Sequence, residues 1–162
     1  MGIDSGAAWF VLAMAAGLLI TWVAWRLLQF GHQVAALVVV GFAALLCSPV
    51  SWGHHWVWAL PLVVLLLAWA RADAEAHRWR WLAGTGAVVF VARMHWWFPN
   101  TNNQELDWNL LQQTLGASYL IWSLAALVTI GAAAHRVPVR ALTGSRPLSV
   151  SPATGSGSSA DA

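Results

Sequence analysis

Long stretches without a charged residue constrain this chain more than any other feature of its sequence. The run from Ala7 to Trp25 contains nineteen consecutive uncharged positions, close to the ~20 residues that a helix needs to cross the hydrocarbon core of a bilayer. Only 9% of the 162 residues are charged and 59% are hydrophobic, whereas a soluble domain is typically about 25% charged. The composition therefore predicts a membrane protein.

The apolar runs predict an all-α, polytopic membrane helix bundle. Backbone groups find no water partners in hydrocarbon, so each run should be helical. The five predicted spans lie near residues 7–25, 30–47, 56–70, 81–97 and 114–134, in one transmembrane domain of residues 1–142. A signal peptide is the alternative for the first run, but no basic segment precedes it. Residues 143–162 are small, polar and rich in Pro and Gly, which predicts a disordered cytoplasmic tail.

The positions of the arginines predict how the bundle is oriented. All eight basic residues are arginines, and seven of them fall in alternate loops on one side. The positive-inside rule assigns that side to the cytoplasm, so we expect a multi-pass plasma-membrane protein with its N-terminus outside and its C-terminus inside. The sequence contains no run of like charges, so its charge pattern does not indicate a nucleic-acid partner. The seven are Arg26, Arg71, Arg78, Arg80, Arg136, Arg140 and Arg146.

The segment CSPVSWGHHWVWALP, residues 47–61, lies on the predicted outer side between the second and third spans. Pro49 and Ser51 favour the start of a helix. The N-terminus of such a helix carries partial positive charge and free N–H groups, which suit an anion. His54 and His55 add hydrogen-bond donors at that point. The segment thus predicts a phosphate-binding site facing outward.

The histidine pair has two other interpretations, a structural one and a metal site. Histidines at a membrane interface are often only structural. A metal site is disfavoured because adjacent helical residues point about 100° apart and the usual ligand pairing is i, i+4. The single cysteine, Cys47, excludes an intrachain disulfide and a cysteine-based metal cluster. We therefore expect neither a metal nor a cofactor.

Arg93 is the second anomaly, because it lies on the predicted outer half of the fourth span. A charge at membrane depth is costly unless the side chain reaches the interface or meets a partner. Arg93 either pairs with Glu105 or Asp107 in the outer loop, or adds a cation to the site of the histidine pair. The sequence leaves both open. His95, two residues later, is expected to line that site or to lie at the interface.

The segment SPVSWGHHWVWALP, a following apolar span and the outer-loop sequence QELDWNLLQQ resemble the C-terminal part of a known family. The family is that of the actinobacterial polyprenol-phosphate-mannose-dependent α-(1→2)-mannosyltransferases, which form glycosyltransferase family 87. The resemblance implies that the chain has part of the C-type membrane fold of this family. The resemblance implies a polyprenyl-phosphate mannose donor at the outer leaflet and a mannoside glycolipid acceptor. A near relative in the same sequence family transfers arabinofuranose, so the resemblance leaves polyprenyl-phosphate arabinose as the alternative donor.

The resemblance also suggests roles for individual residues. His54 and His55 match the family motif and would be catalytic, binding phosphate or acceptor and stabilising charge on the leaving phosphate. Ser51, Trp52 and Trp56 would shape a substrate-binding pocket. Arg93 and His95 would also line that pocket, because of their position on the predicted outer side rather than because of the resemblance.

The chain departs from the family at the catalytic base. The resemblance implies an acidic residue in the first extracytoplasmic loop, but only Asp4 precedes the first predicted span. Glu105 and Asp107 are the other acidic residues on the outer side and are better explained as solvated or capping residues. We therefore expect a C-terminal fragment, inactive alone, that lacks an N-terminal portion or a partner chain. The competing interpretation is a non-enzymatic accessory or lipid-binding membrane protein.

Overall fold

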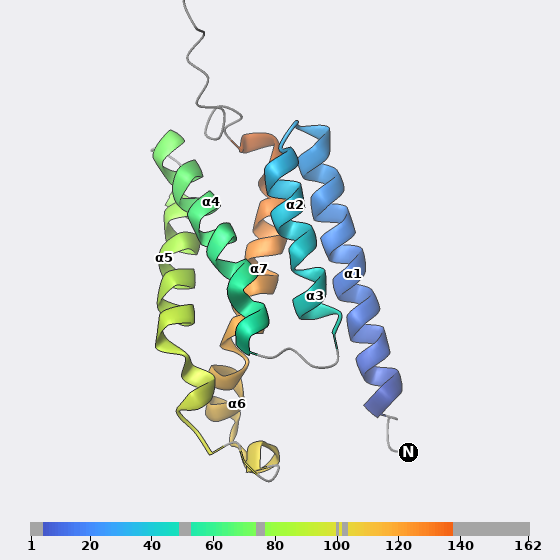
Figure 1. Ribbon diagram of the computed structural model, residues 1–162, viewed down its shortest axis with the longest axis vertical. Coiled ribbons are helices and arrows are strands. Elements are labelled where there is room, and N and C mark those ends of the chain that lie inside the picture. The colour runs from blue at the N-terminus through green and yellow to red at the C-terminus, as the bar shows by residue number, and fades with distance from the viewer. Residues whose placement is uncertain (1–4, 49–52, 74–76, 100, 102–103, 138–162) are drawn as a thin grey trace, which may run out of the picture.

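The computed structural model describes residues 5–48, 53–73, 77–99, 101 and 104–137 (Figure 1). Every element in these ranges is a helix, which confirms the all-α prediction for the described part of the chain. The long helices α1, α2, α4, α5 and α7 run roughly along one axis (Figure 1). The elements are α1 (Ser5–Gln29), α2 (Gln33–Gly41), α3 (Ala43–Leu46), η1 (Gly53–Trp58), α4 (Ala59–Ala72), α5 (His77–Ala92), η2 (Met94–Trp96), η3 (Gln104–Asp107), α6 (Leu110–Gly116), α7 (Ser118–Ala133) and η4 (Ala134–Arg136), where η marks a 3-10 helix.

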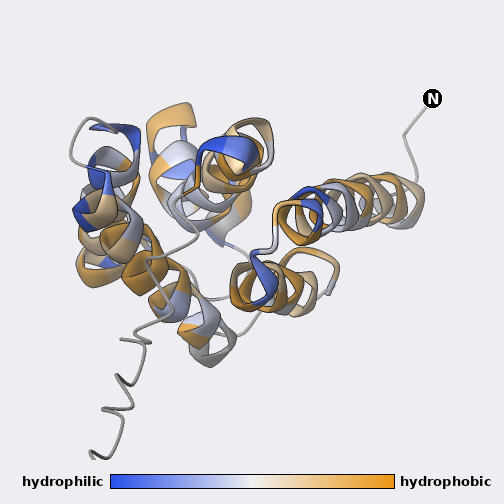
Figure 2. Cartoon of the chain, turned by 90° about the horizontal axis from the view of Figure 1, so that it is seen from above, coloured by the Kyte–Doolittle hydropathy of each residue, from blue (hydrophilic) through white to orange (hydrophobic). Residues whose placement is uncertain are grey.

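The helices pack around α7, which contacts α1 on one side and α5 on the other. Helix α4 packs against α5 and also touches α2, while α2 lies along α1. The most deeply buried side chains include Leu27 of α1, Leu66 of α4 and Leu127 of α7, together with Phe42 between α2 and α3. Hydrophobic residues also cover outward surfaces of the helices, as Figure 2 shows from the end of the bundle. Such outward apolar surface is expected where a helix faces lipid.

Two helices are long and apolar enough to cross a bilayer, Gly6–Gln29 and Ser118–Arg136. They correspond to the first and fifth predicted spans. The segments Gln33–Leu46 and Trp56–Ala72 are apolar but shorter, and they match the second and third. Helix α5 stops at Ala92, short of the predicted end of the fourth span at residue 97. The count of five spans and their orientation therefore stay predictions.

Two predicted spans are divided in the structure. Residues 30–47 form α2 and α3, separated at Phe42, whose N–H donates to the carbonyl of Val39 at 3.0 Å. Phe42 is fully buried, so tertiary packing holds the tighter turn there. The fifth span is preceded by α6 and divided from it at Ala117. The capping box of Asn109 and Gln112 starts α6 earlier than the predicted residue 114, because both free backbone N–H groups gain acceptors.

The described arginines gather at one end of the bundle with a single exception. Arg26 ends α1 and Arg71 ends α4, while α5 runs in the opposite direction and carries its arginines in its first turn. Arg136 lies in η4, at the end of α7. Arg93 follows α5 at the other end (Figure 1). Arg140 and Arg146 lie outside the described residues. The arginines that occupy alternate loops of the sequence thus lie together at one end of the described bundle, which we call the basic end.

Two buried tryptophans offer a matched test of hydrogen bonding in this bundle. The indole N–H of Trp122 donates to the carbonyl of Leu82 at 3.1 Å and contacts the Thr85 hydroxyl at 3.3 Å. The indole N–H of Trp79, which stacks edge-on against Trp69, has no acceptor among the described residues. We expect Trp122→Phe to lower the free energy of unfolding by about 1 kcal/mol more than Trp79→Phe. Denaturant unfolding in detergent measures both, and equal losses would contradict the hydrogen-bond assignment.

Candidate functional site

The histidine pair lies in η1, directly before α4. The sequence predicted an α-helix that starts near Pro49 and Ser51, whereas the α-helical pattern begins at Ala59 and residues 53–58 form a 3-10 helix. His54 and His55 are the second and third residues of this 3-10 helix. Their side chains, and all of Ser51 and Trp52, lie outside the described residues.

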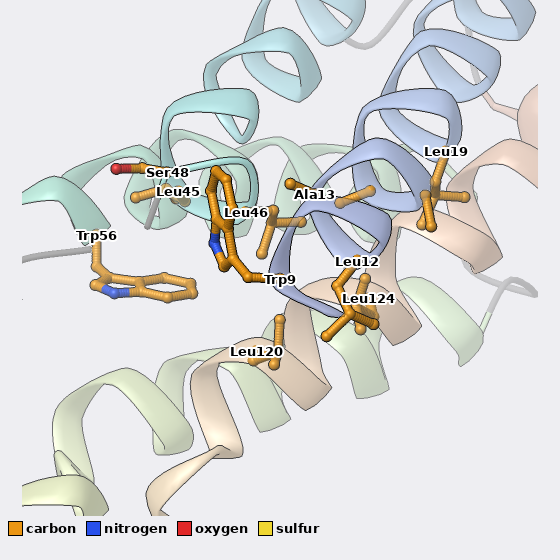
Figure 3. A pocket seen from close by; sticks show the side chains of 12 residues that line it. Trp9, Leu12, Ala13, Leu19, Leu45, Leu46, Ser48, Trp56, Leu120 and Leu124 are labelled. Carbon is orange, nitrogen blue, oxygen red and sulfur yellow. The ribbon is translucent and has the colours of Figure 1, made fainter. Parts of the chain in front are cut away.

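Trp56 follows the histidines and lines an apolar cavity of about 500 Å³. Figure 3 shows the rings of Trp9 and Trp56 facing the same space, with Leu120 and Leu124 of α7 on another side. The helices α1, α3 and α7 supply almost all of the wall. The lining residues are Trp9, Leu12, Ala13, Ala15, Ala16, Leu19, Leu45, Leu46, Ser48, Trp56, Leu120 and Leu124. A wall of this composition suits hydrocarbon and disfavours an unpaired charge.

The cavity lies in the half of the bundle away from the basic end. Its α1 residues come mainly from the N-terminal half of that helix, and Ser48 follows the end of α3. Its α7 residues come from the first half of α7, which starts at the end of the bundle occupied by α6 (Figure 1). If the basic end is cytoplasmic, as the sequence predicts, the cavity lies toward the outer leaflet.

Trp56 and His95, both predicted site residues, are brought together by Tyr119. The Tyr119 ring lies 5.1 Å from the Trp56 ring and 4.8 Å from the His95 ring, edge-on in both cases. Phe90 completes the cluster, with its ring 4.5 Å from Tyr119 and 5.9 Å from Trp56. The Tyr119 hydroxyl donates to the Phe90 carbonyl at 3.2 Å. We call these four residues the aromatic cluster.

Tyr119 and Phe90 were not among the site residues predicted from the sequence. A signal was present for the first of them, because Tyr119 is the single tyrosine of the chain and lies in an apolar run. A buried tyrosine hydroxyl usually needs a hydrogen-bond partner, so its position could have been expected at a contact between helices. Phe90 carried no such signal, since phenylalanine is ordinary in an apolar helix.

Arg93, the residue that follows α5, has an unusual backbone conformation. Its φ angle is 51°, in the left-handed region that arginine rarely occupies. Trp97 stabilises this end of the helix, because its indole N–H donates to the Ala92 carbonyl at 2.9 Å. Arg93, Trp96 and Trp97 are exposed, and with Ala92 they line a shallow pocket of about 300 Å³. Among the described side chains no ion pair joins Arg93 to Asp107, and the Glu105 side chain is outside them.

The loop that carries Glu105 and Asp107 is held apart from the apolar cavity. The Trp108 indole N–H donates to the Pro99 carbonyl at 2.8 Å, and its ring packs edge-on against Phe98. Asp107 is exposed beside Trp108. None of the described residues that line the cavity belongs to this loop. The arrangement can hold a lipid chain and a polar headgroup, but it does not put a described carboxylate beside them.

Comparison with known proteins relates the chain to one group of mycobacterial enzymes. It is 36% identical over 145 residues to a polyprenol-phosphate-mannose-dependent α-(1-2)-phosphatidylinositol mannoside mannosyltransferase of Mycobacterium tuberculosis, covering 83% of this chain and 32% of that protein. The protein of the same name in Mycolicibacterium smegmatis is 33% identical over 133 residues, covering 76% of this chain and 29% of the relative.

A third relative matches a shorter stretch. A polyprenol-phosphate-mannose-dependent α-(1-2)-phosphatidylinositol pentamannoside mannosyltransferase of M. tuberculosis is 42% identical over 65 residues, covering 40% of this chain and 15% of that protein. The chain thus spans about a third of the length of the first two relatives. No family model matches the chain. No solved structure matches it either.

Proposed function

This chain belongs to the family of polyprenol-phosphate-mannose-dependent α-(1→2)-mannosyltransferases, of which it matches a part, and we propose that it binds the lipid-linked mannose donor. The observation that carries the proposal is the apolar cavity beside η1. A polyprenyl-phosphate sugar has a long hydrocarbon chain next to a charged phosphate, and here a hydrocarbon-lined cavity adjoins the segment that bears the histidine pair. The matched region would be the C-terminal part of the enzyme.

In the proposed complex the polyprenyl chain lies in the cavity and the phosphate lies at His54 and His55. During transfer an acceptor hydroxyl oxygen bonds to the anomeric carbon of mannose, and the bond from that carbon to the phosphate oxygen breaks. The electron pair of that bond stays on the polyprenyl phosphate. Imidazole N–H groups placed at the phosphate stabilise this charge as it develops. Ser51, Trp52 and Trp56 would border the sugar.

The acceptor hydroxyl must lose its proton to a base. Asp107 is exposed in the outer loop, whose described residues do not line the cavity. We therefore propose that the base comes from a segment outside this chain, as the family resemblance implies. The acceptor would be a phosphatidylinositol mannoside, as in the names of the relatives, and the reaction would occur at the outer face of the plasma membrane.

Donor binding can be tested on the chain itself in lipid nanodiscs. We expect saturable binding of radiolabelled polyprenyl-phosphate mannose that excess unlabelled polyprenyl phosphate displaces. Polyprenyl-phosphate arabinose serves as the second competitor, and stronger competition by it than by the mannose donor would change the assigned sugar. Binding that does not saturate would exclude the cavity as a donor site.

The same preparation tests the expectation that the chain is inactive alone. With a phosphatidylinositol mannoside present, we expect donor binding without mannose transfer above the rate in empty nanodiscs, because none of the described residues that line the cavity is a carboxylate. Thin-layer separation of the radiolabelled lipids measures the product. Efficient transfer by the chain alone would contradict the assignment of the base to another segment.

The apolar cavity also suits a second candidate function, that of a lipid-binding accessory protein without transferase chemistry. Such a protein would hold a polyprenyl or acyl chain in the same cavity. It differs from the enzyme in one respect, since its role would not depend on His54 and His55. Substitution of the two histidines in a transfer assay therefore separates the candidates.

A further inference from the structure

The shallow pocket at the end of α5 has features that donor binding in the apolar cavity does not use. It is lined by Ala92, Arg93, Trp96 and Trp97, and it has a volume of about 300 Å³. It lies at the end of the bundle opposite the other described arginines (Figure 1). We propose that this pocket binds the phosphodiester-linked sugar headgroup of an anionic glycolipid.

Arg93 supplies the cation of the pocket, and its backbone is fixed by hydrogen bonds. Glycine is the usual residue where a helix ends in the left-handed conformation, yet here that position is Arg93, with φ 51°. Its backbone is tied on both sides, because its N–H donates to the Val89 carbonyl at 3.3 Å and its carbonyl accepts from Trp96 N–H at 2.9 Å. The guanidinium is exposed at the pocket, and a guanidinium is a preferred partner of a phosphate.

The two tryptophans supply the sugar-binding surface. Each is 60% exposed, and aromatic faces stack on the C–H faces of sugar rings while their edges remain compatible with water. The Trp97 indole is oriented in advance by its hydrogen bond to Ala92. Trp96 packs against His95 with ring centroids 5.5 Å apart. A pocket lined by one arginine and two exposed indoles matches a headgroup that joins a phosphate to a sugar ring.

The pocket and the apolar cavity lie on two sides of the aromatic cluster. Trp56 lines the cavity and contacts Tyr119, which contacts His95, which contacts Trp96 at the pocket. This inference rests on the proposed function, under which two glycolipids must meet at one site. With the donor chain in the apolar cavity, the pocket beyond the cluster is available for the headgroup of the second lipid.

The test measures headgroup binding separately from donor binding and transfer. The full chain in phosphatidylcholine nanodiscs is titrated with a photoreactive phosphatidylinositol, and crosslinked peptides are mapped. We expect crosslinks near residues 92–97, and Arg93→Gly or Trp96→Ala to weaken binding by about tenfold, equivalent to loss of one charge-assisted contact. Arg71→Gln and Trp81→Ala remove an exposed arginine and an exposed tryptophan elsewhere and should leave binding unchanged.

Arg93→Gly was chosen because glycine adopts the same φ without strain. Its melting temperature should therefore stay at or above that of the original chain, and reduced lipid binding would then reflect the lost cation. The same variants are titrated with polyprenyl-phosphate mannose. A loss confined to phosphatidylinositol supports the acceptor headgroup, and a loss confined to the donor supports the donor phosphodiester. Unchanged binding of both lipids in Arg93→Gly and Trp96→Ala would overturn the proposal, whatever the donor does in the cavity.

Discussion

Ala16→Trp should weaken binding of polyprenyl-phosphate mannose by about a hundredfold without destabilising the chain. Ala16 lines the apolar cavity on α1, and an indole at this position would occupy space that the polyprenyl chain needs. Excluding about four CH₂-sized groups from burial, at about 0.8 kcal/mol each, costs about 3 kcal/mol, which is roughly a hundredfold in affinity. The same indole buries new apolar surface inside the protein, so the melting temperature should hold or rise.

Ala125→Trp is the matched control for this substitution. Ala125 is an exposed residue of α7 that does not line the cavity. The added bulk is the same, but it points away from the proposed polyprenyl site, and donor binding should be preserved. Binding in nanodiscs and thermal unfolding are measured on both variants. Normal donor binding by a folded Ala16→Trp chain would show that the polyprenyl chain does not bind in the cavity.

His54→Ala and His55→Ala should each lower mannose transfer by about 10²–10³-fold, the usual cost of one preorganised donor to a developing anion. The effect is measured in a complete enzyme, made by replacing the matched region of the M. smegmatis relative with this chain. Because the histidines act most strongly on the departing phosphate, kcat should fall more than the affinity for the donor.

His77→Ala is the control for these variants. His77 is an exposed histidine in the first turn of α5, at the basic end of the bundle. Its removal should leave transfer unchanged. If the two η1 variants were also fully active, the histidine pair would have no catalytic role, and the accessory lipid-binding function would become the better explanation of the cavity.

Much of the architecture followed from local properties of the chain. Uncharged apolar runs satisfy their backbone groups in lipid only as helices, and the described elements are indeed helical. The motif around His54 and His55 led to the family that the comparisons support. Helix ends were less predictable, because the break at Phe42 depends on how that ring is buried against other helices.

The sequence by itself determined the helical class, the basic end and the segment beside which a site could form, since each depends on residue type and spacing along one run. The tertiary structure decided which of these residues meet. Trp56 and His95 are linked only through Tyr119 of α7, whose ring contacts both, and the cavity exists only because α1, α3 and α7 pack with a gap. Contacts between helices far apart in the chain leave no periodic signal, because they depend on shape rather than on hydrophobicity.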